Sequence, residues 1–205
     1  MKNTTVFFRV CYPEPGMVKP KIEQEAGFNI ARAVYKELIR ATYHHLEKLT
    51  DTSNIVIFCD PENRLGEIKS LLGNMDFDYQ PMPKGSKGEV VASCFEYCFS
   101  KGTEKAIYSH VDSPTLTYDL IERTSVSLNN DSVVIGPATN GELYILGLNE
   151  KSYNSLKSEI VKMDNITSET AIEIAKTLDG KSKIYNKEVC IDTLEDWENY
   201  QDSLA

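Results

Sequence analysis

The chain has 205 residues, of which 41% are hydrophobic, and its formal net charge is −9 at pH 7. That length suffices for one well-buried domain and does not require two. The negative charge excludes general affinity for the nucleic-acid backbone, because the longest basic cluster, Lys19-Pro20-Lys21, is too short to override it.

Cysteine usage and the N-terminal residues bear on the compartment. The five cysteines are odd in number, no CxxC occurs, and no signal peptide precedes the first apolar run. These features are typical of a reducing environment and predict a cytoplasmic protein. No apolar run approaches the roughly 20 residues that a membrane-spanning helix needs, so no span is expected.

Seven short apolar runs predict β-strands. The second is continuous and apolar, which is typical of a strand buried inside a parallel sheet. In chain order the predicted strands are Val6–Val10, Asn54–Cys59, Phe77–Gln80, Lys105–Val111, Ser132–Ile135, Leu143–Leu148 and Lys183–Tyr185.

Helical spacing of apolar residues falls between these strands. It runs from about Ala26 to Leu49, and again after Asp60, which is a predicted N-cap because Pro61 follows it. That second helix should end at Gly73. Further helices are predicted from about Gly88 to Lys101, from Thr167-Ser168 to near Gly180, and from a capping box at Thr193, with Trp197 packing the last helix onto the domain.

The alternation of strands and helices predicts one three-layer α/β/α domain over residues 1–205, with a mostly parallel, Rossmann-like sheet. The run Leu143–Leu148 is the exception. It follows Ser132–Ile135 after only a short turn, which predicts an antiparallel insertion in the sheet.

The loop from Pro15 to Gly27 is the first candidate binding segment. A loop after the first strand of an α/β protein often meets a ligand. Its Gly16, Lys19 and Lys21 could neutralise a diphosphate, with help from backbone N–H groups at the helix start. It could also be a solvated basic connection, because it matches neither GxGxxG nor the P-loop.

Two acids and one turn complete the candidates. Asp112 follows an inner strand, where its carboxylate could hold Mg²⁺ against phosphate oxygens or merely cap the turn that Ser113 and Pro114 begin. Asp192 could be a second metal ligand, but a strand-end acid before a capped helix is the simpler interpretation. Asn140-Gly141 favours a hairpin turn.

Other chemically active residues receive simpler interpretations. Cys94 and Cys98 share a helix face with phenylalanines, so they are expected to be buried thiols. No Ser–His–Asp triad can be assembled from a local signature. His110 is the only histidine near a candidate site.

Five segments, in order over nearly the whole chain, resemble the motifs of one family. It is a bacterial group once described as a domain of unknown function and related to nucleotide-diphospho-sugar transferases of the GT-A-like glycosyltransferase fold. The segments and the motifs they resemble are Pro15–Ile22 (PGxVKTRL), Gly85–Gly102 (GDLGERM…AF…AF…G), Val111–Leu116 (SDxPxL), Val133–Leu148 (VVLGPAxDGGYYLIGL) and Cys190–Trp197 (DVDTPEDL).

The resemblance implies a GT-A-like sheet and the transfer of a glycosyl or nucleotidyl group from a nucleotide-diphosphate-type donor. It implies a nucleotide sugar or a nucleotide as ligand and Mg²⁺ or Mn²⁺ as cofactor. The implied site consists of Arg9, Gly16, Lys19, Lys21, Gly88 and Glu89 for phosphate, Asp112 for catalysis and, with Asp192, for metal, and Asn140, Gly141 and Glu142 on the acceptor side.

Six positions depart from the family's motifs, and they keep a second hypothesis open. This chain has Pro20 where the family has Thr, Lys21 for Arg, Ser86 for Asp, Val90 for Arg, Asn140 for Asp and Glu142 for Gly. The groups lost by these replacements include a guanidinium fork that suits phosphate and a carboxylate. The alternative is a non-catalytic relative that binds a ligand or a partner protein on the same scaffold. A homodimer is suggested by base rates alone.

Overall fold

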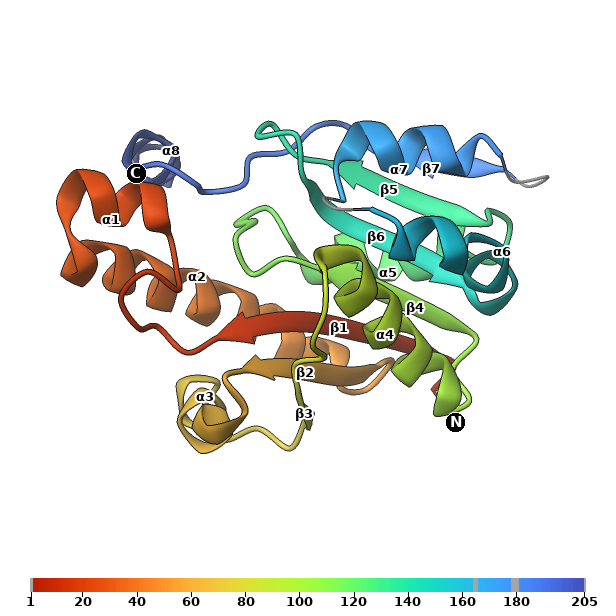
Figure 1. The fold of residues 1–205 in the computed structure, drawn as a ribbon, viewed down its shortest axis with the longest axis horizontal. Helices are drawn as coiled ribbons and strands as arrows, with labels where there is room; N and C mark the ends of the chain where they lie inside the picture. The colour runs from red at the N-terminus through yellow and green to blue at the C-terminus, as the bar shows by residue number, and fades with distance from the viewer. Residues whose placement is uncertain (1, 164–165, 178–180, 205) are drawn as a thin grey trace.

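The structure is a computed structural model that describes residues 2–163, 166–177 and 181–204. One seven-stranded sheet runs through it in the order β3-β2-β1-β4-β6-β5-β7 (Figure 1). The strands are β1 (Thr4–Cys11), β2 (Asn54–Asp60), β3 (Asp78–Pro81), β4 (Lys105–Ser109), β5 (Val133–Pro137), β6 (Leu143–Asn149) and β7 (Ser182–Ile184). All seven predicted strands are therefore present.

The direction of β6 sets the character of the sheet. β6 runs antiparallel to both of its neighbours, β4 and β5, whereas β1 pairs in parallel with β2 and β4, and β5 pairs in parallel with β7. The predicted fold, a mostly parallel sheet with an antiparallel insertion, is confirmed.

Helices cover both faces of the sheet (Figure 1). Side chains of α2, α3 and α5 enter one core cluster with the strands, and those of α4, α6 and α7 enter another. The helices are α1 (Pro20–Ala26), α2 (Phe28–Leu49), α3 (Leu65–Leu71), α4 (Lys87–Ser100), α5 (Tyr118–Ser127), α6 (Glu150–Val161), α7 (Ser168–Ala175) and α8 (Leu194–Asp202), with a short 3₁₀ turn η1 (Glu62–Arg64).

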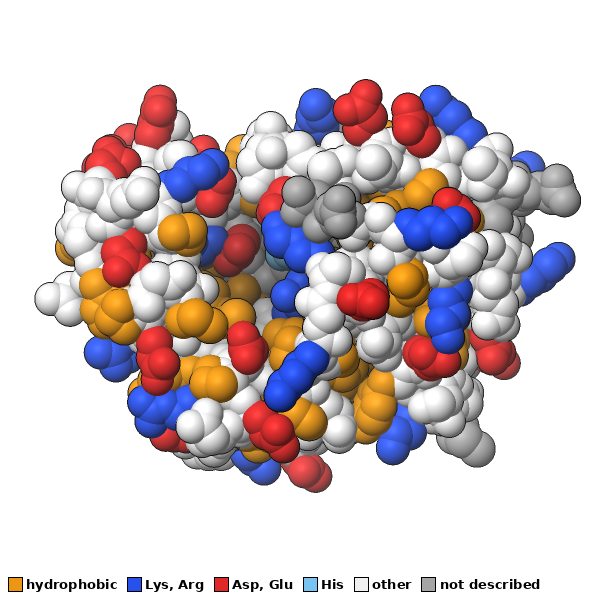
Figure 2. Space-filling model, viewed as in Figure 1, with side chains coloured by type: hydrophobic (Ala, Val, Ile, Leu, Met, Phe, Trp, Pro, Cys, Tyr) orange, Lys and Arg blue, Asp and Glu red, His pale blue; other side chains and the backbone are white. Residues whose placement is uncertain are grey.

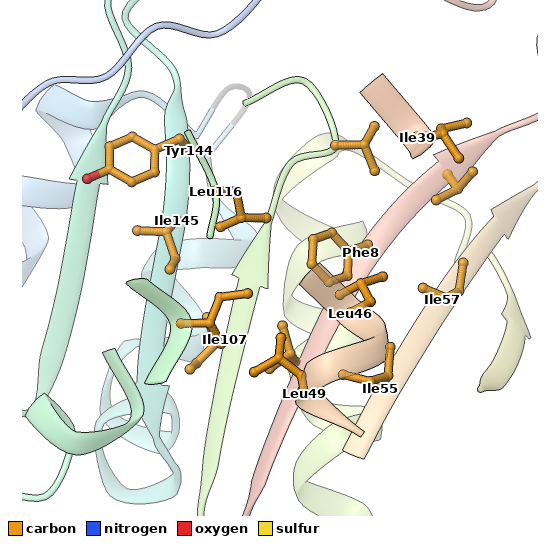
Figure 3. Close-up of a cluster of buried hydrophobic side chains, with 14 of the residues drawn as sticks. Phe8, Ile39, Leu46, Leu49, Ile55, Ile57, Ile107, Leu116, Tyr144 and Ile145 are labelled. Atoms are coloured by element: carbon orange, nitrogen blue, oxygen red, sulfur yellow. The ribbon is translucent and has the colours of Figure 1, made fainter. Parts of the chain in front are cut away.

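Strand alternation explains why the sheet is buried on both sides. Phe7 and Phe8 are consecutive and fully buried, and they point to opposite faces. Phe8 packs among the α2-side residues of Figure 3, while Phe7 meets Phe95 of α4 edge to face at 4.9 Å. Burying each ring contributes roughly 1.5–3 kcal/mol.

A third, smaller cluster ties the two ends of the chain together. Ile22 of α1, Val34 of α2 and Ile191 are buried, and Trp197 and Tyr200 of α8 pack against them. The predicted role of Trp197, to pack the last helix onto the domain, is confirmed.

Two predictions about the first half are wrong. The segment before Gly27 is not all loop, because Pro20–Ala26 forms α1 and Gly27, with φ of 85°, separates it from α2. Asp60 is not an N-cap: it ends β2, and helical turns begin only after Pro61, whose backbone is extended.

The remaining helices differ in smaller ways. α5 and α6 were not predicted, and α7 ends at Ala175 whereas the predicted end near Gly180 lies outside the described residues. The predicted capping box at Thr193 is confirmed, and the helix predicted after Thr167-Ser168 begins at Ser168 with Thr167 as its N-cap. None of the helices in the described ranges combines the length and the apolarity that crossing a membrane requires.

Candidate functional site

A cleft opens at the carboxyl ends of β1, β2 and β4, which is where open parallel sheets bind ligands. It consists of three hollows of about 430, 330 and 820 Å³, and Arg9 lines all three. In Figure 2 the molecule is hollowed near the centre of the face, with blue Lys and Arg side chains on the wall. The lining extends from Arg9 to Asp192, so the fold gathers residues from nearly the whole chain.

Arg9 lies near the end of β1, on the face that α4 covers, because it is two residues from Phe7. Its Nε contacts Met82 Sδ at 3.4 Å, and within the described residues no ion pair engages it. Burial lowers the pKa of Arg9, but Tyr108 and the thiols of Cys94 and Cys11 together more than offset this, so the net pKa lies above its usual value. Arg9 is thus a permanent cation with N–H groups available for an anion.

Tyr108 and His110 stand beside Arg9 in the cleft. Tyr108 Oη and His110 Nε2 lie 2.9 Å apart, and the Tyr108 ring stacks on Phe7. Burial lowers the pKa of His110, and the nearby carboxylate of Asp112 offsets this only in part. The imidazole is therefore neutral at pH 7.

The N-terminus of α4 reaches the cleft through Lys87, its first residue. Ser86 and Glu89 form a capping box, in which each side chain accepts a hydrogen bond from the other's backbone N–H. Ser86 therefore replaces the family's Asp with another favoured N-cap residue. Lys87 is exposed and enters none of the ion pairs among the described residues, so it adds a second available charge at the positive end of a 14-residue helix.

Three predicted phosphate-binding positions are engaged within the chain. The Gly88 N–H donates to the Met163 carbonyl at 3.2 Å, and the Gly16 N–H donates to the Glu23 carboxylate at 2.8 Å. The Glu89 carboxylate serves the α4 cap. Their contact with phosphate stays a prediction, and the fold itself accounts for each of them.

Lys19 and Asp112 form an ion pair at the bottom of the cleft. Lys19 Nζ lies 2.7 Å from Asp112 Oδ1, and the Lys19 side chain is only 4% exposed. The same ammonium donates a hydrogen bond to the carbonyl of Ile191. The predicted phosphate lysine and the predicted metal carboxylate are thus brought together and bound to each other.

Lys21 and Asp192 repeat this pairing at the surface. Lys21 Nζ lies 2.5 Å from Asp192 Oδ2, and the Lys21 side chain is 62% exposed. Asp192 lines the same hollow as Asp112. No group of three or more His, Cys, Asp or Glu suited to a metal ion occurs in residues 2–163, 166–177 and 181–204. Each candidate metal carboxylate therefore already has a lysine as its partner.

Asn140, Gly141 and Glu142 form the β5–β6 hairpin turn and line the cleft. Asn140 Oδ1 accepts a hydrogen bond from the Glu142 N–H, and Gly141 has a φ of 86° that favours glycine. The predicted hairpin turn is confirmed, and the predicted acceptor role remains untested. Glu142 is exposed and adds a negative charge to the cleft.

Tyr108 and Lys87 were not predicted as site residues. Strand alternation offered a signal for Tyr108, because it lies two residues before His110. For Lys87 the signal was the capping box Ser86–Glu89, which fixes the helix start. Only the packing of α4 on the sheet shows that this helix start faces the cleft.

The fold is shared with solved structures of transferases. A crystal structure described as a "putative nucleotide-diphospho-sugar transferase", from Desulfovibrio desulfuricans G20, has a TM-score of 0.89 and 19% identity over 99% of this chain and 88% of that one. The 4-diphosphocytidyl-2C-methyl-D-erythritol synthase from Anaerococcus prevotii DSM 20548 has a TM-score of 0.66 and 12% identity over 99% and 98%.

A third structure was solved with a metal. Rv0371C from Mycobacterium tuberculosis H37Rv, in complex with manganese, has a TM-score of 0.63 and 8% identity over 99% of this chain and 100% of that one. At such low identities these likenesses establish the fold alone, which is the GT-A-like, nucleotidyltransferase-like α/β fold that the motifs implied.

Sequence comparison settles the family. No curated protein matches the chain. A family model does match, over residues 45–160, which is more than half of the chain. The protein belongs to the family described as "Uncharacterized protein conserved in bacteria (DUF2064)".

Proposed function

We propose that the protein is a transferase that binds a nucleotide-diphosphate-type donor in the cleft and transfers its glycosyl or nucleotidyl group. The solved proteins that share the fold include one described as a "putative nucleotide-diphospho-sugar transferase" and a 4-diphosphocytidyl-2C-methyl-D-erythritol synthase. The functional unit is residues 1–205, because the cleft draws on side chains from Arg9 to Asp192.

The available charge of Arg9 carries this proposal. The guanidinium of Arg9 lines three hollows and has no carboxylate partner in the described chain, so it is available to bind an anion of matching geometry. Phosphate accepts two parallel hydrogen bonds from such a fork. Lys87 and the positive end of α4 add to the attraction, so developing charge on a diphosphate leaving group would be stabilised here.

The implied divalent cation fits these residues poorly. Mg²⁺ and Mn²⁺ prefer several oxygen ligands, and the two candidates, Asp112 and Asp192, each face a lysine ammonium within 2.7 Å. No role in the transfer is therefore assigned to a metal here. Asp112 instead holds Lys19, and His110, Tyr108 and Arg9 form the polar wall that a donor would meet.

Glu142 favours the alternative, a non-catalytic relative that binds a ligand or a partner protein. This exposed carboxylate lines two of the hollows and opposes an anionic donor. Ser86 does not add to that argument, because it keeps the cap of α4.

Calorimetric titration with nucleoside diphosphates and their sugar conjugates tests the proposal. The wild type should bind at least one of them. Arg9→Met should weaken that binding about ten- to a hundredfold, which is the worth of a hydrogen bond to a charged group. Arg40→Met is the matched control, because Arg40 is exposed on α2 and paired with Glu37. A well-folded protein that binds none of these ligands would favour the alternative, and equal binding by Arg9→Met would contradict the role given to Arg9.

A further inference from the structure

Lys19 is held in an unusual backbone conformation. It precedes α1 with φ of 50° and ψ of 54°, in the left-handed region that side-chain-bearing residues seldom adopt. No hydrogen bond from its side chain caps α1. Strain of this kind persists where the surrounding structure enforces it, and it clusters at ligand sites. Here it accompanies a buried ammonium that points into the cleft.

The ammonium joins three parts of the cleft that lie far apart in sequence. It belongs to the loop after β1, pairs with Asp112 beyond β4, and donates to the carbonyl of Ile191 before α8. An ammonium has three N–H donors. One of them donates to the Ile191 carbonyl, and Asp112 Oδ1 is held by charge rather than by a hydrogen bond, so donors remain for a group in the hollow, which Lys19 also lines.

A carboxylate and a carbonyl around one positive centre are ligands that a divalent metal would use. In this cleft that centre is Lys19 Nζ, 2.7 Å from Asp112 Oδ1. A metal bound to the same oxygen would lie within a few ångströms of a buried ammonium, and two such cations repel strongly where water is scarce. Asp112 can therefore hold Lys19 or a metal, but not both.

We propose that Lys19 is the resident cation of this cleft, so that a nucleoside diphosphate binds to Arg9, Lys19 and Lys87 without Mg²⁺ or Mn²⁺. This inference rests on the proposed function, because the ligand is the diphosphate group of the same donor. Lys19 neutralises the phosphates from a fixed position, and Asp112 positions Lys19 rather than a metal.

The first test is calorimetry with UDP, CDP, GDP and ADP, each in EDTA and in MgCl₂. The wild type should bind the preferred diphosphate equally well in both buffers. Lys19→Met, which keeps the apolar stem, should bind it about tenfold or more weakly in EDTA, and Mg²⁺ should restore part of the affinity. Lys48→Met, an exposed lysine of α2, is the matched control. If Lys19→Met lost affinity only because the loop around residue 19 had unfolded, Mg²⁺ would not restore the binding of the diphosphate.

The second test uses MnCl₂ alone, followed by electron paramagnetic resonance of free Mn²⁺. The wild type should bind no Mn²⁺ through Asp112. Lys19→Met should gain a Mn²⁺ site, and Lys19→Met combined with Asp112→Asn should lose it. Thermal unfolding checks that each variant folds.

The outcomes separate the two proposals. A wild type that binds a diphosphate only with Mg²⁺, or that binds Mn²⁺ at a site removed by Asp112→Asn, overturns the inference about Lys19 and leaves the proposed function standing. A wild type that binds no diphosphate in either buffer defeats the proposed function. The Mn²⁺ titration of the wild type and Asp112→Asn then still decides whether Lys19 excludes a metal, even if Lys19→Met fails to fold.

Discussion

Gly88 of α4 packs directly against the backbone of α6 at Ile160. A Cβ at position 88 would lie 2.2 Å from the Ile160 carbonyl oxygen and 2.6 Å from that of Met163. The contact brings the N-terminus of α4 to a fixed place at the cleft, and it explains a glycine whose family motif suggested a phosphate contact.

Gly88→Ala should therefore destabilise the protein. Carbonyl oxygens of a packed helix end cannot move aside freely, and overpacking of this kind costs typically about 1–3 kcal/mol. Urea unfolding would measure the loss. Gly66→Ala is the matched control, because Gly66 is also helical and nothing lies within 4 Å of its added Cβ. That substitution should be neutral or stabilising by up to about 1 kcal/mol. Equal effects at the two positions would contradict the packing role of Gly88.

The sequence predicted the strands better than the first helix, for a physical reason. Strands such as Asn54–Asp60 are buried on both faces, so their composition reports their place directly. Helix α1 has only seven residues and one fully buried side chain, Ile22, between Pro20 and Gly27, so its signal resembles a loop. Its stability comes from α8 and α2, which no local pattern reveals.

The site residues also differ in how far the sequence could predict them. Asp112 could be predicted because it follows the end of a strand, whereas Arg9 was implied only by the family resemblance. The pairing of Lys19 with Asp112 could not, because it depends on how the loop after β1 folds over the end of β4. Gly88 and Glu89 show the reverse case: helix packing and capping account for these two motif positions without a ligand, and their contact with phosphate stays a prediction.

Cys11 should react slowly with alkylating agents. Burial, and then the neighbouring Asp60 carboxylate, raise the pKa of the Cys11 thiol to about 11. The thiolate is the nucleophile, so iodoacetamide at pH 8 should modify Cys11 about a hundredfold more slowly than a free thiol of ordinary pKa. The rate should rise steeply toward pH 11. Peptide mass mapping against time and pH measures it, with urea-unfolded protein as the control. A rate that levels off near pH 9 would contradict the raised pKa.

The capping box of α8 makes a prediction about acid stability. Burial alone would raise the pKa of Asp196, but the backbone N–H groups of Thr193 and Asp192, which donate to its carboxylate, bring it below the usual value. Since the folded pKa is lowered, the stabilisation is full above the unfolded pKa of about 4 and is lost as the pH falls through the folded pKa.

Asp196→Asn should therefore cost about 1 kcal/mol at neutral pH, and the difference from wild type should shrink below about pH 4. Urea unfolding across this pH range measures it. Glu195→Gln is the control, because Glu195 is the exposed neighbour in the same helical turn. A penalty that stays constant down to pH 2 would show that the effect is not electrostatic.

Removing the charge of Glu142 should tighten the binding of an anionic ligand. Glu142 lies on the hairpin turn and lines two of the hollows that Arg9 lines, so its carboxylate repels a diphosphate placed there. Glu142→Gln keeps the size of the side chain and removes the repulsion. For an exposed charge the gain should be modest, about two- to fivefold in affinity, and it should fade at high salt.

Calorimetry with the diphosphate that the wild type prefers, at low and high NaCl, measures both effects. Glu47→Gln, an exposed acid of α2 that lines none of these hollows, should change neither. Weaker binding by Glu142→Gln would contradict the repulsion and would mean that Glu142 contacts the ligand favourably, for example through a sugar hydroxyl. Glu142, which stands where the family motif has Gly, would then be a residue that determines the ligand specificity of this chain.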